Sequence, residues 1–229
     1  MSTRTALVAG ATGLVGGHLV RRLLDAEAWN RVVTLGRRPL DPGSGPGQAL
    51  DHPKLEQRTV DFDRLADADL PHADDAFCGL GTTIKKAGSE EAFRTVDYDY
   101  VLAFARAARQ HGAGQFAVVS AMGANAGSRI FYNRVKGEME QAVAAVGFEA
   151  VQIVRPALLL GDRDEHRLGE RAWQLLMQPA TPLLLGPLRK YRPIEADAVA
   201  AAMVAAAQVR TPGVHVYESD ELQRTASAA

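Results

Sequence analysis

A glycine-rich turn between the first apolar run and the first helical segment constrains the fold more than any other feature of the chain. Residues 6–9 form a short apolar run typical of a buried strand, and residues 14–24 repeat apolar side chains at a helical period. The turn has the spacing GxxGxxG, and its residues are Gly10, Ala11, Thr12, Gly13, Leu14, Val15 and Gly16. Gly10 permits a tight strand-to-helix turn, Gly13 lets the backbone approach a pyrophosphate, and Gly16 lets the helix pack close to the sheet. This context favours a dinucleotide-binding turn in these seven residues, and an ordinary glycine-rich turn is the alternative.

The alternation of short apolar runs and helical segments continues along most of the chain. Further strands are expected at residues 31–35, 58–61, 76–80, 116–120, 150–154 and 213–217, and further helices at residues 90–110, 130–146, 168–177 and 195–207. Strands that alternate with helices imply right-handed crossovers and a parallel sheet with both faces covered. We therefore expect a single α/β domain over residues 1–229, a Rossmann-type doubly wound parallel sheet with helices on both faces. Residues 157–212 are expected to contribute a small region that covers the substrate.

Composition excludes several other classes of protein. The chain has 229 residues, 47% of them hydrophobic, and a net charge of -1. This apolar share excludes a disordered chain, and the balanced charge argues against a nucleic-acid partner. The single cysteine, Cys78, excludes a disulfide framework, and the scattered histidines predict no metal site. No apolar run reaches the roughly 18 residues that span a bilayer, and no secretory signal is present, so we expect no membrane association and a cytoplasmic location.

Two arginines follow the expected second strand. In an NAD enzyme this position usually carries an acidic residue that binds the ribose 2′-hydroxyl group. Here Arg37 and Arg38 stand there, and no acidic residue occurs between Asn30 and Leu40. Guanidinium groups suit a 2′-phosphate because they can bind it through paired hydrogen bonds. The pair favours NADP(H) as the cofactor over NAD(H), and a solvated basic pair in a loop is the alternative.

A tyrosine and a lysine share one face of the helix expected at residues 130–146. Tyr132 and Lys136 are four residues apart, so they lie one helical turn from each other. An ammonium group lowers the pKa of a neighbouring phenol, which favours proton transfer. Ser120, at the end of the preceding strand, could donate a hydrogen bond to a substrate carbonyl oxygen. These three residues are the predicted catalytic group, and a surface helix with no such role is the alternative.

These motifs together resemble the short-chain dehydrogenase/reductase family, in its extended or atypical form. Within that family the chain is similar to the group of Tat-interacting-protein-like oxidoreductases and their bacterial relatives. The matching positions are residues 10–16, 36–38, 60–62, 77–83, 86–88 and 96–102, Tyr132 with residues 135–138, and then Arg155-Pro156 and Asp162-Arg163. They are spread over about two-thirds of the chain, in the family's order.

The resemblance implies further roles for residues of this chain. It implies that Asp61 and Phe62 lie beside the adenine, that Leu80, Gly81 and Thr82 line the cofactor, and that Pro156 and Ala157 lie near the nicotinamide. It also assigns Ser120, Tyr132 and Lys136 to the family's catalytic trio, with Lys136 on the cofactor ribose. One position departs from the pattern. Many relatives carry an asparagine that supports a proton relay on the helix after the fourth strand, whereas this chain offers Asp97.

The expected function is an NADP(H)-binding oxidoreductase that transfers a hydride to a small carbonyl substrate, with Tyr132 as the acid/base. A regulatory or scaffold protein that binds NADP(H) with little turnover is the alternative from a different class. Sugar-nucleotide epimerase chemistry is disfavoured because such a pocket usually needs a larger C-terminal part. The expected partner is a small-molecule substrate, and either a monomer or a homodimer is compatible with the sequence.

Overall fold

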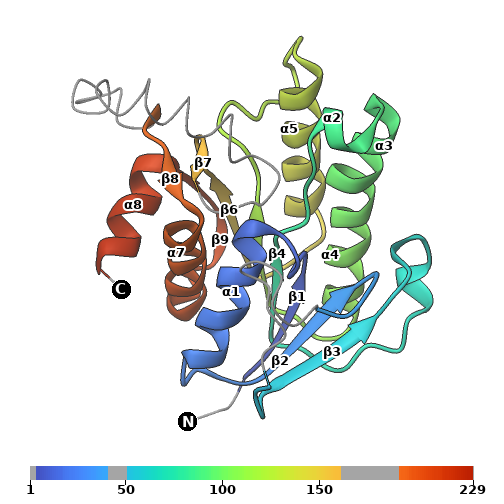
Figure 1. Ribbon diagram of the computed structural model, residues 1–229, viewed down its shortest axis with the longest axis vertical. Helices are drawn as coiled ribbons and strands as arrows, with labels where there is room; N and C mark the ends of the chain where they lie inside the picture. Colours follow the sequence, from blue (N-terminus) through green and yellow to red (C-terminus); the bar gives the residue numbers. More distant parts are fainter. Residues whose placement is uncertain (1–3, 41–50, 161–190, 229) are drawn as a thin grey trace.

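Seven of the described strands form one parallel sheet, as expected for a Rossmann-type fold (Figure 1). The computed structural model describes residues 4–40, 51–160 and 191–228. The strands of the sheet are β1 (Arg4–Ala9), β2 (Trp29–Gly36), β3 (Leu55–Thr59), β4 (Asp75–Cys78), β5 (Gln115–Val119), β6 (Ala150–Arg155) and β9 (Gly213–Glu218). Their spatial order is β3-β2-β1-β4-β5-β6-β9, and every pairing is parallel. The order reverses between β1 and β4, which is the place where open α/β sheets bind their ligands.

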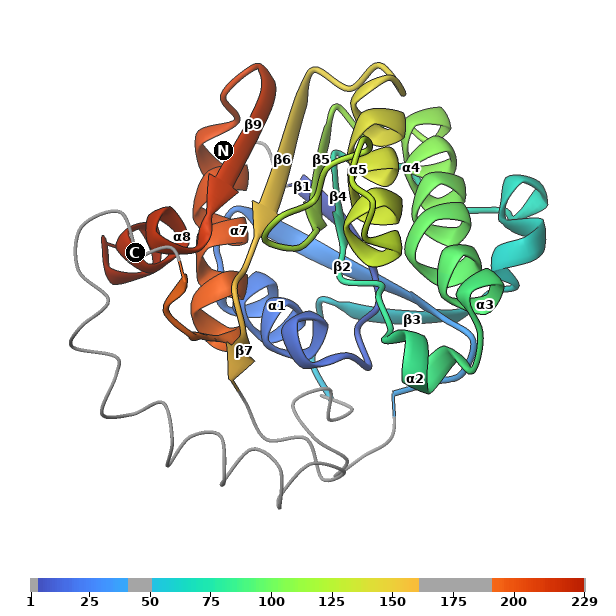
Figure 2. The same cartoon turned by 90° about the horizontal axis from the view of Figure 1, so that it is seen from above.

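Helices cover both faces of the sheet (Figure 2). One face carries α1 (Leu14–Asp25) and α7 (Ala196–Val209), and α8 (Ser219–Ala228) packs beside α7. The other face carries α4 (Tyr100–Gln110) and α5 (Phe131–Ala144). The doubly wound architecture predicted from the alternation of apolar runs and helices is therefore confirmed.

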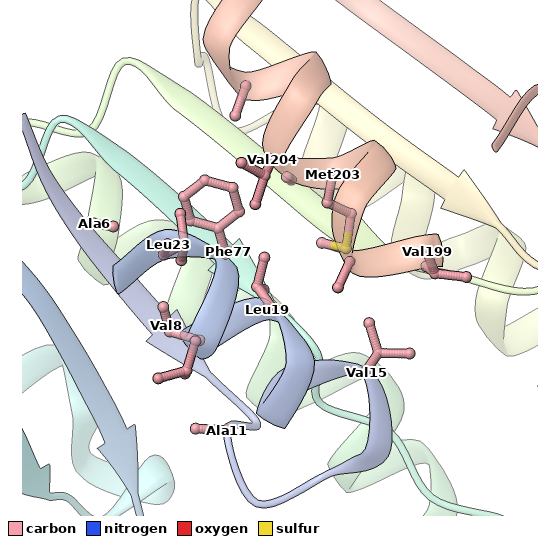
Figure 3. Close-up of a cluster of buried hydrophobic side chains, with 14 of the residues drawn as sticks. Ala6, Val8, Ala11, Val15, Leu19, Leu23, Phe77, Val199, Met203 and Val204 are labelled. Atoms are coloured by element: carbon pink, nitrogen blue, oxygen red, sulfur yellow. The ribbon is translucent and has the colours of Figure 1, made fainter. Parts of the chain in front are cut away.

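The core between α1, α7 and the sheet explains why these two segments are helices. The apolar period of α1 places Val15, Leu19 and Leu23 on one side, where all three are buried. They meet Val199 and Met203 of α7 over the sheet (Figure 3). A second core lies on the opposite face, beneath α4 and α5.

The helix expected at residues 90–110 is divided into three parts. It begins as α3 (Glu90–Arg94), continues as a π-helical turn η3 (Thr95–Asp99) and ends as α4. Within the turn, the backbone N–H of Tyr100 donates to the carbonyl oxygen of Thr95, five residues earlier. The apolar period does not show this extra residue, because α3 has only 5 residues, too few to define a helical phase against which the shift could be seen.

Several short elements complete the described chain. They are the 3₁₀ helix η2 (Phe62–Asp67), α2 (Ile84–Ala87) and a separate pair of strands, β7 (Leu159–Leu160) and β8 (Ile194–Glu195). Residues 161–190 lie outside the described residues, so the helix predicted at residues 168–177 and most of the covering region predicted at residues 157–212 stay predictions. In the three described ranges, no helix has the length and apolar character needed to cross a bilayer.

Candidate cofactor and active site

The glycine turn packs against the carboxyl end of β4. Gly10 has φ +86°, and a Cβ atom there would overlap the carbonyl carbon of Gly79. A Cβ atom on Gly16 would overlap the carbonyl oxygen of Gly10. A Cβ atom on Gly13 would lie 3.2 Å from that same oxygen, which is tight but no overlap. The fold itself therefore requires glycine at positions 10 and 16, and the space beside Gly13 is the most open of the three.

The amino end of α1 is free to receive an anion. Gly13 is the N-terminal cap, no side chain in the described chain caps the helix, and no acidic residue occurs in its first turn. The side chains of Leu14 and Val15 are buried in the core, so these residues can offer only backbone N–H groups to a ligand. Unpaired N–H groups and the positive end of the helix dipole suit a pyrophosphate. The residues present thus fit the diphosphate of a dinucleotide.

A pocket lies between the glycine turn and the carboxyl end of β2. Its lining includes residues 10–12 of the turn, Arg37 and Arg38, Phe62 and Leu80. Both arginines are exposed, and none of the described lining residues carries a carboxylate. Among the residues described, neither guanidinium has an ion-pair partner within 4.0 Å. The pocket offers positive charge to a ligand without a competing internal anion.

Phe62 forms an aromatic wall of this pocket. Its ring is buried and lies 5.4 Å from the ring of Tyr100, centroid to centroid. Asp61 does not line the pocket; its carboxylate accepts a hydrogen bond from the backbone N–H of Asp63 and caps η2. The predicted contacts of Gly81, Thr82 and Pro156 also fall outside the lining of this pocket.

The predicted catalytic residues lie on β5 and α5. Ser120 directly follows β5 and is buried, and its hydroxyl has no hydrogen-bond partner in the described part of the protein. Tyr132 stands in the first turn of α5, where its ring packs 5.3 Å from the buried ring of Phe93. Lys136 follows one turn later and is only 3% exposed. An unpaired buried hydroxyl is costly in a folded protein, so a ligand that accepts its hydrogen bond would relieve that cost.

Asp97 binds Lys136, a pairing that sequence reasoning did not find. The Lys136 ammonium lies 2.7 Å from Oδ1 of Asp97, and the backbone N–H of Thr82 donates to Oδ2 of the same carboxylate at 2.9 Å. A Cβ atom on Gly81 would lie 3.4 Å from Oδ1 of Asp97 and 3.8 Å from the lysine nitrogen. The carboxylate therefore ties the turn after β4 to α5.

The electrostatics of this cluster differ from the sequence-based expectation. We expected Lys136 to lower the pKa of Tyr132. The ammonium does act in that direction, but burial and the nearby Asp97 carboxylate together raise the pKa of the phenol above its ordinary value. Burial is the largest single influence and acts to lower the pKa of Lys136, but the charge and hydrogen bond of Asp97 together with the charge of the Tyr132 phenolate raise the pKa of the lysine overall. Both groups thus hold their protons more tightly than exposed ones.

The strand that leads to Pro156 is fixed by a three-residue ion-pair network, which the sequence did not indicate. Arg155 donates to both carboxylate oxygens of Glu140 on α5, at 2.9 and 2.6 Å, and to Glu218 on β9 at 3.2 Å. The carbonyl oxygen of Pro156 accepts a hydrogen bond from the backbone N–H of Met122. This bond holds the loop after β5 against the end of β6.

Comparison with known proteins identifies the family. A family described as NAD(P)H-binding matches residues 10–210. The chain belongs to this NAD(P)H-binding family. Rat protein HTATIP2 is 37% identical over 173 residues, which cover 74% of this chain and 69% of the relative. Protein FMP52, mitochondrial, of Eremothecium gossypii is 35% identical over 164 residues, which cover 72% and 70%.

Solved structures share the fold of this NAD(P)H-binding protein. The Bordetella bronchiseptica enzyme WbmH, in complex with NAD+, has a TM-score of 0.69 at 15% identity and covers 95% of this chain and 76% of its own. The human epimerase family protein SDR39U1, with NADPH, has a TM-score of 0.61 at 19% identity and covers 93% and 74%. The predicted resemblance to short-chain dehydrogenase/reductases of the Tat-interacting-protein type is confirmed, as is a nicotinamide dinucleotide as the class of cofactor.

The predicted cytoplasmic location is wrong. Fungal relatives that match the chain, including those of Eremothecium gossypii and Candida albicans, are named mitochondrial. The prediction depended on the absence of a secretory signal with its apolar core. A mitochondrial address does not need such a core, because transit peptides are amphipathic and rich in arginine.

Proposed function

We propose that this NAD(P)H-binding protein is an NADP(H)-dependent reductase of a small carbonyl substrate. The observation that carries the cofactor choice is the pocket beside the glycine turn, which contains two free guanidinium groups and no carboxylate among its described lining residues. A carboxylate there would bind a ribose 2′-hydroxyl group and repel a 2′-phosphate. Arginine fits a phosphate because its planar fork can donate two parallel hydrogen bonds.

The chain's own residues supply binding, orientation and a proton. The N–H groups at the start of α1 hold the diphosphate, and Arg37 and Arg38 hold the 2′-phosphate. The free hydroxyl of Ser120 donates a hydrogen bond to the substrate carbonyl oxygen. When bound, NADPH supplies a hydride to the carbonyl carbon. Tyr132 donates its phenolic proton to the oxygen, so the carbonyl becomes an alcohol.

The cofactor assignment is tested by replacing Arg37 and Arg38 together with alanine. Loss of the charge-assisted hydrogen bonds should raise the Kd for NADPH by roughly 10- to 100-fold, which corresponds to about 1.4–2.7 kcal/mol in total, the scale of a single hydrogen bond to a charged group. The Kd for NADH should change little, since NADH carries no 2′-phosphate. Fluorescence titration with both cofactors measures this. Arg106→Ala, an exposed arginine on α4, is the matched control. Equal weakening of both cofactors would contradict the assignment.

The catalytic assignment is tested by Tyr132→Phe, which removes only the phenolic oxygen. We expect turnover with a panel of aldehydes and ketones to fall at least about 100-fold, the usual contribution of a positioned acid, with NADPH affinity retained. Tyr217→Phe, on β9, is the control. If the native protein binds NADPH but turns over no member of the panel, the binding-only alternative is supported. Unchanged turnover in Tyr132→Phe would reject the role of the phenol.

A further inference from the structure

The π-helical turn η3 presents Asp97 to the active site. An α-helix that ran on from α3 would close its hydrogen bonds four residues apart, whereas Tyr100 bonds to Thr95, five residues earlier. Asp97 is the only buried residue of this turn and is 0% exposed. Single π-helical turns are rare and are frequent at functional sites. The widened turn therefore directs a carboxylate into the protein, where it meets Lys136.

Among the residues that the structure describes, few other charges face this carboxylate. Lys136 comes from α5 and Tyr132 from the first turn of the same helix, and the buried thiol of Cys78 comes from β4. Burial raises the pKa of that thiol to about 12, so it stays neutral. Arg94 and Glu138, which also join α3 to α5, pair with each other. The charge balance of the cluster is therefore set by Asp97, Lys136 and Tyr132.

We propose that Asp97 is a positioning residue whose carboxylate keeps both the Lys136 ammonium and the Tyr132 phenol protonated. A fully buried lysine without a counter-ion tends to lose its proton. The Asp97 carboxylate lies 2.7 Å from the Lys136 ammonium nitrogen and prevents that loss. The hydrogen bond from the backbone N–H of Thr82 holds the carboxylate in place. Its negative charge also opposes the formation of a phenolate at Tyr132, because two nearby anions repel each other.

This protonation state favours one direction of the reaction, carbonyl reduction over alcohol oxidation. A site in which both side chains are protonated can donate a proton to a carbonyl oxygen. It accepts a proton from an alcohol poorly. This consequence rests on the function proposed above, whereas the protonation of the two side chains does not. The two ideas can therefore fail separately.

Asp97→Asn removes the charge and keeps an oxygen that can accept the hydrogen bond from Thr82. The probe is the free protein, labelled with ¹³C at the lysine ε-carbons and the tyrosine ζ-carbons and followed by NMR as the pH is raised. The signals of Lys136 and Tyr132 are identified by their absence in Lys136→Met and Tyr132→Phe. In Asp97→Asn at least one of the two should titrate about one pH unit or more below its position in the native protein. If the protein is a reductase, kcat/KM for carbonyl reduction should also begin to decline at a lower pH in Asp97→Asn than in the native protein.

Asp99→Asn is the matched control, because it removes the same charge from an exposed position of the same turn. It should leave both titrations unchanged. Equal shifts in the two variants, or no shift in Asp97→Asn, would overturn the proposal.

A second measurement covers the case in which Asp97→Asn does not fold. Removing one partner of a buried ion pair leaves an uncompensated charge, and removing both relieves it. The double variant Asp97→Asn/Lys136→Met should therefore resist urea better than Asp97→Asn alone. A double variant that is no more stable than the single one would show that the two charges are not coupled, and the proposal would fall.

Discussion

At the scale of single residues, the local contacts that favour glycine differ among the three positions of the turn. Gly10 combines a positive φ with direct contact with Gly79, and Gly16 meets the carbonyl oxygen of Gly10. These two positions are fixed by packing, with or without a ligand. Gly13 is the least crowded of the three, since a Cβ atom there would lie 3.2 Å from the carbonyl oxygen of Gly10.

Gly10→Ala and Gly147→Ala separate the cost of conformation from the cost of contact. Both glycines have a positive φ, but nothing lies within 4 Å of a Cβ atom built on Gly147. Gly147→Ala should lose about 1–2 kcal/mol of unfolding free energy from backbone strain alone. Gly10→Ala should lose at least about 1 kcal/mol more through overpacking, and it should weaken NADPH binding. Urea unfolding and cofactor titration measure the two effects. Equal losses would mean that the turn is free to move away from Gly79.

The residues that sequence reasoning identified are those whose signal is local. The glycine spacing, the arginine pair and the tyrosine–lysine spacing are each contained within one turn or one helix face. The partnership of Asp97 with Lys136 joins two helices, and no periodicity links them. A buried lysine requires a partner of opposite charge. The sequence could therefore indicate that a carboxylate lies near Lys136, but not which residue supplies it.

At the scale of elements, apolar periodicity predicts which segments are helices and strands, and packing decides where they end. The helical period predicted for α1 is confirmed, because its apolar side chains are buried. The strand predicted at residues 150–154 is also confirmed, and the structure extends it by one residue. The division at η3 and the helix α8 were not predicted. Leu222 of α8 is buried in the core that includes α7.

The contact between α1 and α7 offers a matched test within one helix. Val199 is 0% exposed in the core that α7 shares with α1, whereas Val209 is 74% exposed near the end of the same helix. Val199→Ala should lower the free energy of unfolding by about 2 kcal/mol, the value of burying such a side chain. Val209→Ala should change it by less than about 0.5 kcal/mol. Urea denaturation compares them, and equal effects would show that α7 does not form part of the cooperative core.

At the scale of the whole molecule, the sequence predicts a parallel sheet with both faces covered but not the order of its strands. The order depends on contacts between distant segments, such as the pairing of β9 with β6. The same pairing brings Glu218 to Arg155, so the strand before Pro156 is braced by a segment from the far end of the chain. Only the assembled sheet shows this.

The cofactor should stabilise the whole domain, because the described lining of its pocket comes from β2, β3, η2 and the turns that follow β1 and β4. A ligand at 100 times its Kd adds about 2.7 kcal/mol to the free energy of unfolding. For a domain of this size that corresponds to a rise in Tm of roughly 5–10 °C. At equal concentration NADH should raise the Tm less than NADPH. Calorimetry with each cofactor makes the comparison, and a larger rise with NADH would contradict the cofactor preference.

The π-helical turn also has a consequence for how the chain can change. One extra residue in a helix turns everything after it by about 100° relative to a straight helix. In a sequence alignment, η3 corresponds to an insertion of one residue. A relative with a straight helix here should therefore align with a one-residue gap within Thr95–Asp99. A substitution can replace the carboxylate of Asp97, but only a deletion can remove the turn that carries it inward.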